Sequence, residues 1–116
     1  METEITMNKL VYLNRGDTLD FPFLINEGND LEPSPYILQD GEFLYFGVME
    51  PNQPFEVALI RKKYDKDNQN EEGYINIHLD VDDTILLLPG TYYYEIKLQR
   101  GNEVKTLVSK RKFIIL

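Results

Sequence analysis

The sequence predicts an all-β protein: an immunoglobulin-like antiparallel β-sandwich of seven to eight strands with at most one short helical turn. Two observations support this fold class. Apolar and polar residues alternate along most of the strand-like segments, and this period of two is typical of strands. Turn residues recur about every ten positions, a spacing typical of sandwiches and small barrels. Because 116 residues leave room for only one core, we expect a single domain over residues 1–116.

The strands are expected where the alternation is regular. The clearest is "YINIHLDV", in which Ile75, Ile77, Leu79 and Val81 share one face and His78 lies on the other. In residues 19–25, Pro22 has no N–H for a sheet ladder and predicts an edge strand or a bulge. Further strands are expected in residues 4–13, 42–50, 55–64, 91–100, 103–108 and 112–116.

The one helical turn is expected in "DVDDTILLL", capped by Asp82 or Asp83 and stopped by Pro89. The stretch that follows predicts a tyrosine corner, in which the Tyr92 hydroxyl bonds to a backbone group a few residues upstream. The alternative is that Tyr92 is an ordinary strand tyrosine after a Pro89-Gly90 turn.

The inventory of catalytic residues is poor, so we expect no enzyme and no cofactor. There is one histidine, His78, on the polar side of a strand, and neither serine lies in a G-x-S-x-G motif. Spacing alone leaves a Ser-His-Asp triad open. The absence of cysteine excludes disulfides and Cys-based metal sites. The acidic stretch 65–76 begins like a calcium loop, but Asn70 and Asn76 replace the required glycine and glutamate, which favours a solvated hairpin.

The net charge of -8 argues against nucleic-acid partners and anionic membranes. Two basic runs, residues 61–63 and 110–112, are interpreted as solvated strand ends. Aromatic residues are the remaining candidates for binding. Tyr93 and Tyr45 are expected on an outer face, where they would form a protein interface, stack on sugars or simply suit a strand.

The tripeptide Arg15-Gly16-Asp17 matches the integrin-recognition signal, but it lies between two strand-like runs. We interpret it as a tight turn. Gly16 supplies a permissive backbone, and the side chains of Asp17 and Thr18 are expected to bond to backbone N–H groups two residues on.

The order of these motifs resembles the immunoglobulin-like N-terminal domain of tailed-phage baseplate upper and tail-appendage proteins. The resemblance covers residues 11–116. It rests on Gly16, Asp17 and Thr18 before an alternating strand, and later on Asp83, Thr84, Leu87, Pro89, Gly90, Tyr92 and Tyr94.

The resemblance implies a non-enzymatic structural or adaptor domain in a phage or prophage virion, assembled in the host cytoplasm. Its partners would be other phage structural proteins, with self-association as an open alternative, and neither nucleic acid nor membrane. That family continues into a coiled coil or fibre after this domain, whereas this sequence stops in "KFIIL". The alternative function is a carbohydrate-binding β-sandwich module that uses exposed tyrosines.

Overall fold

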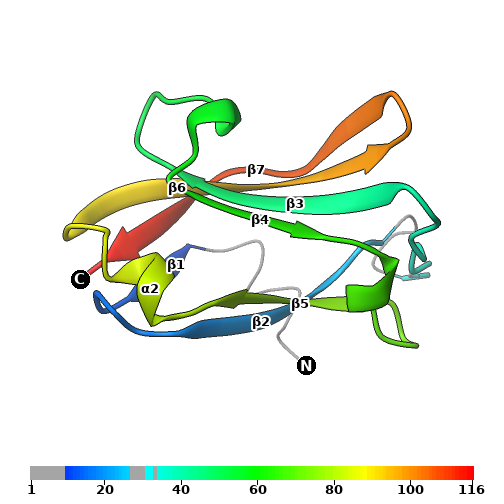
Figure 1. The fold of residues 1–116 in the computed structure, drawn as a ribbon, viewed down its shortest axis with the longest axis horizontal. Coiled ribbons are helices and arrows are strands. Elements are labelled where there is room, and N and C mark those ends of the chain that lie inside the picture. Colours follow the sequence, from blue (N-terminus) through cyan, green and yellow to red (C-terminus); the bar gives the residue numbers. More distant parts are fainter. Residues whose placement is uncertain (1–9, 27–30, 33) are drawn as a thin grey trace.

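Two β-sheets packed face to face form the framework of the computed structural model, which describes residues 10–26, 31–32 and 34–116 (Figure 1). Within these residues there are seven strands. The larger sheet has the order β1-β7-β6-β3-β4, and the smaller one pairs β2 with β5. The strands are β1 (Val11–Leu13), β2 (Leu19–Leu24), β3 (Glu42–Met49), β4 (Ile60–Tyr64), β5 (Tyr74–Leu79), β6 (Gly90–Arg100) and β7 (Glu103–Ile115). The predicted all-β sandwich is confirmed.

The core fills the space between the sheets, where the alternating residues of the sequence meet. Phe21 of the smaller sheet packs edge-on against Phe46 of the larger one, with ring centroids 5.9 Å apart. Phe46, Tyr94 and Phe113 are fully buried, as are Ile75 and other members of the apolar alternation. The period of two therefore identified the inward faces of β2, β3 and β5 correctly.

One strand pair departs from the expected antiparallel arrangement. β1 runs parallel to β7, with Val11 opposite Phe113 and Leu13 opposite Ile115. Val11 and Leu13 are both buried, so the short strand is held by its apolar side chains as well as by its ladder. The part of the predicted first strand in residues 4–9 lies outside the described residues.

The predicted strand 55–64 is wrong in its first half. Residues Phe55–Val57 form a 3-10 turn, η1, and β4 begins only at Ile60. Phe55 is buried, whereas Val57 and Leu59 are exposed, so the three do not share an inward face. The ring of Phe55 folds onto the outer face over Gly47, where a Cβ would stand 2.5 Å from it. The missing side chain in β3 thus makes room for this ring.

The two strands predicted in residues 103–108 and 112–116 are one continuous strand, β7, which forms a long hairpin with β6. Its register shifts between Tyr94 and Ile96 and again between Ile96 and Lys97. Lys110 lies beside the first shift with a φ of 43°. Bulges of this kind let a strand bend without ending it. The polar residues at the bulges are the reason that the sequence predicts two separate strands here.

The helical turn exists, but its cap differs from the prediction. α2 (Val81–Thr84) begins after Asp80, whose carboxylate accepts a hydrogen bond from the Asp83 N–H while Asp83 accepts one from the Asp80 N–H. This reciprocal pair makes Asp80 the cap, because its backbone is extended and Asp82 lies inside the turn. The described residues also contain two 3-10 turns, η1 and η2 (Lys66–Asn68), beyond the single helical turn expected.

The two basic runs lie on edges of the larger sheet rather than at strand ends. Residues 61–63 fall inside β4, the last strand of that sheet. Residues 110–112 fall inside β7, just before residues 113–115, which pair with β1 among the described residues. All of them are exposed except Lys62, which is half-buried.

Candidate functional site

The Gly-Asp-Thr segment forms a tight turn between β1 and β2. The Asp17 N–H donates to the Asn14 carbonyl at 3.0 Å, and the Asn14 N–H donates to the Asp17 carboxylate at 3.2 Å. The expectation that the Asp17 side chain bonds two residues forward is therefore wrong, since it closes the turn backward. Gly16 has a φ of 86°, which an L side chain rarely adopts. Thr18 is exposed and leads into β2.

This turn is fastened to the crossover that follows β5. The buried Thr84 hydroxyl donates to the Asp17 carbonyl at 2.7 Å, and Arg15 Nε donates to the Ile85 carbonyl at 2.7 Å. A Cβ on Gly16 would meet the Ile85 side chain at 3.0 Å. The arginine of the Arg-Gly-Asp tripeptide thus holds two distant segments together, which favours the structural interpretation of the motif over adhesion.

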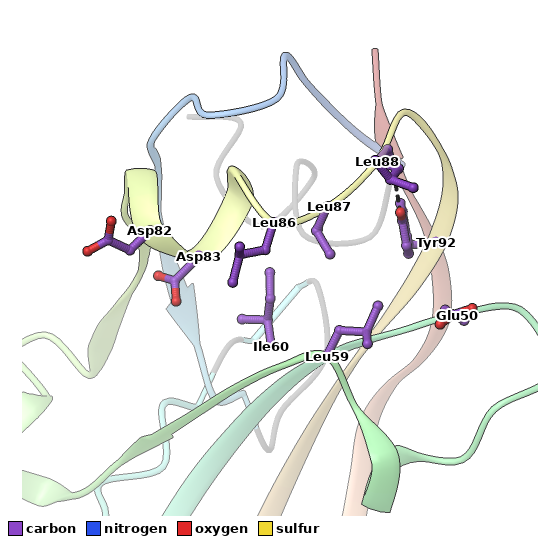
Figure 2. A pocket seen from close by; sticks show the side chains of 9 residues that line it. All are labelled: Glu50, Leu59, Ile60, Asp82, Asp83, Leu86, Leu87, Leu88 and Tyr92. Carbon is purple, nitrogen blue, oxygen red and sulfur yellow. Dashed lines mark hydrogen bonds between the residues drawn. The ribbon is translucent and has the colours of Figure 1, made fainter.

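The tyrosine-corner bond is formed as the sequence predicted. The Tyr92 hydroxyl donates to the Leu88 carbonyl at 2.7 Å, across Pro89 and Gly90 (Figure 2). Gly90 has a φ of 153°, which allows the chain to turn sharply into β6. The bond fixes the end of the crossover relative to the larger sheet.

Tyr45 and Tyr93 both lie on the outer face of the larger sheet, but the structure does not bring them together. Tyr45 is opposite Lys97 and Tyr93 is opposite Met49, with Gly47 and the overlying Phe55 between the two positions. Both tyrosines are half-buried. They do not form a continuous exposed stripe.

The surroundings of Tyr45 are also occupied. Its hydroxyl donates to Gln99 Oε1 at 3.1 Å. Lys63 Nζ lies 4.0 Å from the centroid of the Phe43 ring and 6.0 Å from that of Tyr45. The cation covers part of the aromatic surface that a sugar would need.

The single histidine contacts a carboxylate on the exposed face of the smaller sheet. His78 Nδ1 lies 2.6 Å from Asp20 Oδ1, and the Asn76 amide donates to the same oxygen at 3.0 Å. Both hydrogen bonds lower the pKa of Asp20, the one from Asn76 more than the one from His78. Ser34 lies in the loop that leads to β3, and Ser109 lies in β7. The arrangement is a cross-strand polar cluster open to water.

The acidic stretch 65–76 is not the expected hairpin: it connects β4 of the larger sheet to β5 of the smaller one and begins with a capped 3-10 turn. Asp65 caps η2 by accepting the Asp67 N–H at 2.9 Å, and Asn70 accepts the Tyr74 N–H at 2.9 Å. Asp65, Asn68 and Asn70 therefore bond to the backbone of the loop itself, whereas Gln69 bonds to the backbone of Tyr36 and Leu38. In the described part of the chain, no three His, Cys, Asp or Glu side chains are grouped to hold a metal ion.

A groove lies beside the tyrosine corner. It has a volume of about 420 Å³ and lies between the crossover after α2 and the start of β4 (Figure 2). Leu59, Leu86 and Leu88 line it and are 49%, 79% and 65% exposed. Figure 2 shows Glu50 at one end, and Asp82 and Asp83 at the other.

Sequence reasoning missed this groove. The sequence places the run "ILLL" in residues 85–88 in a helical turn and does not indicate which of its side chains are buried. Only Leu87 is buried, because a short crossover over the end of a sandwich can direct few side chains inward. Four consecutive apolar residues outside a strand were the available signal.

No family model matches the chain, and no curated protein and no solved structure matches it. None of the helices in the described residues is long and apolar enough to cross a membrane.

Proposed function

We propose that the protein is a non-enzymatic structural or adaptor domain of a phage or prophage virion, which attaches proteins to one another in the baseplate, a tail appendage or a fibre. The resemblance to immunoglobulin-like baseplate domains supports this proposal. Its two motif segments, the turn at 16–18 and the crossover at 83–92, contact each other through Thr84 and Asp17. The two segments therefore form one structural unit.

The observation that carries the proposal is the groove. Its lining combines exposed leucines with carboxylates at its two ends, and it contains neither His78 nor a serine. Apolar side chains gathered on a surface and bordered by polar residues often mark a site that binds another macromolecule. A surface of this kind suits attachment to a protein better than chemistry on a substrate.

The alternative, a carbohydrate-binding module, draws support from Phe43 and Tyr45, whose ring centroids lie 6.3 Å apart on the outer face. Against it stand Lys63 over these rings and Gln99 on the Tyr45 hydroxyl. A glycan array separates the two functions, because a sugar-binding module gives reproducible hits that Tyr45→Ala abolishes. An adaptor gives none.

The proposed function is tested on particles. Phage particles released from the source strain would be purified by density gradient and their proteins quantified by mass spectrometry. We expect this chain, alone or within a longer polypeptide, at a fixed copy number relative to the tail proteins. Expression in the producing cells together with absence from the particles would overturn the proposal.

A further inference from the structure

The three exposed leucines of the groove form one apolar surface with no covering segment among the described residues. Leu86 and Leu88 come from the crossover, and Leu59 faces them from the start of β4 (Figure 2). Their backbone is fixed on one side by the bond from Tyr92 to Leu88 and on the other by the bond from the Leu59 N–H to Val48, at 2.7 Å each. The surface is therefore preformed, which lowers the entropic cost of binding.

Three of the open sheet edges, those of β2, β4 and β7, are less suited to binding another chain. β4 presents Arg61 and Lys63 at its open edge, and Lys110 lies where β7 has no described neighbour on the side away from β6. β2 carries Pro22, which has no N–H to donate. Charges and proline on an edge strand discourage the addition of a further strand. The groove is the better docking surface.

The carboxylates at the two ends of the groove indicate which kind of partner it would bind. Among the acids at its ends, Asp83 is paired with Lys62 at 2.9 Å, whereas Glu50 and Asp82 form no ion pair with a described residue. The chain as a whole has a net charge of -8, so a second copy would be repelled. Charge complementarity therefore favours a basic partner over self-association.

We propose that this groove is a docking site for a segment of another protein that carries large apolar side chains flanked by lysine or arginine. The apolar side chains cover Leu59, Leu86 and Leu88, and the cations lie against Glu50 and Asp82. This inference adds a binding site to the proposed function. It rests on that function only in taking the partner to be a virion protein. The binding chemistry is tested without particles, so failure of either proposal can be distinguished from failure of the other.

The test uses two synthetic peptides, one alternating leucine with lysine and a matched one with glutamate in place of each lysine. Each is titrated into isotope-labelled protein and followed by two-dimensional amide NMR. We expect the basic peptide to shift amides of residues 59–60 and 82–92, with an affinity that falls as salt is added. The acidic peptide should leave these amides unchanged.

Two variants test the apolar and the charged parts separately. Leu86→Lys places a charge on the most exposed leucine of the groove, and Asp82→Lys reverses the charge at one end. Leu86→Lys should weaken binding of the basic peptide about tenfold or more, as expected near the centre of an interface. Asp82→Lys should weaken it less, mainly by slowing association and reducing the salt dependence. Val104→Lys is the matched control, because Val104 is 58% exposed on the distant β6–β7 hairpin. It should bind as the parent does.

Three outcomes would overturn the inference. The basic peptide could fail to bind, it could shift amides outside the groove, or both peptides could bind equally. Concentration-dependent dimerisation of the parent, measured by light scattering and abolished by Leu86→Lys, would show instead that a second copy occupies the groove.

Discussion

Tyr92 shows how one hydroxyl stabilises the crossover at the scale of a single residue. Its hydrogen bond to the Leu88 carbonyl is direct and spans the Pro89-Gly90 turn. We expect Tyr92→Phe to lower the free energy of unfolding by about 1 kcal/mol, the net contribution of one such bond. Urea unfolding measures it, with Tyr93→Phe on the outer face as the control. Equal midpoints for Tyr92→Phe and the parent would show that the bond contributes nothing.

Asp83 links stability to pH. Desolvation by burial alone would raise the pKa of the Asp83 carboxyl. The hydrogen bonds that this carboxyl accepts from Lys62 and from the Asp80 N–H outweigh the desolvation, so its pKa is lowered. A carboxylate with a lowered pKa stabilises the fold above its unfolded pKa of about 3.9. That stability is lost as the pH falls through the lower folded value.

We therefore expect Asp83→Asn to be less stable than the parent at pH 7, and the difference to shrink below roughly pH 4. Lys62→Gln should show the same trend, since it removes the partner. Urea unfolding at a series of pH values provides the measurement. A difference that stays constant down to the lowest pH would mean that the ion pair is not the cause.

At the scale of elements, η1 is held against the larger sheet by Phe55 over Gly47. Lys97 and Arg61 lie 5.1 and 5.6 Å from the centroid of its ring, so the ring is surrounded by cations as well as by β3. Beneath this cover Glu95 is 8% exposed, although its place in the alternation predicts an outward, solvated side chain. Glu95 does lie on the outer face of the sheet, as predicted, but the η1 turn covers its side chain.

Gly47→Ala tests this packing. The added Cβ would stand 2.5 Å from the Phe55 ring, so the ring or the turn must move. Overpacking of this kind costs about 1–3 kcal/mol. In a Phe55→Ala background the same substitution should cost much less, and a double-mutant cycle measured by urea unfolding gives the coupling. Additive effects would show that the two residues do not share the space.

The sequence predicts strands well where burial alternates and poorly where tertiary contacts decide. Period two located β2, β3, β5 and β6, because one face of each packs against the other sheet. The same pattern predicted that β4 begins at Phe55, because alternation does not distinguish an aromatic side chain that points into the core from one that folds onto the outer face. It divided β7 at a bulge whose polar residues lie along an open edge.

The candidate site was predictable only in part. The Tyr92 bond could be foreseen because Pro89-Gly90 is a local signal that precedes a strand. The contact between Asp17 and Thr84 joins residues 67 positions apart, which no local pattern encodes. The groove depends on β4 starting late and on Leu86 facing outward, so it becomes visible only once the crossover is placed.

At the scale of the whole molecule, the edges of the larger sheet carry its basic runs. An open strand edge offers unpaired N–H and C=O groups to other chains, and long charged side chains there hinder such pairing. On an acidic protein, cations are concentrated along β4 and the part of β7 that has no described neighbour on the side away from β6. This placement suggests that the two runs keep the edges soluble, which agrees with attachment through the groove rather than through added strands.

The double variant Arg61→Thr, Lys63→Thr tests this interpretation. Threonine suits a strand, but the variant also removes the contacts of Arg61 with Phe55 and of Lys63 with Phe43, so the free energy of unfolding should fall by about 1–2 kcal/mol. Because the β4 edge then lacks its charges, we expect faster aggregation when the protein is held just below its melting temperature, measured by light scattering. Lys66→Thr removes an exposed cation from η2, which lies outside both sheets, and should not accelerate aggregation. If both variants aggregate at the same rate, net charge rather than edge protection controls solubility.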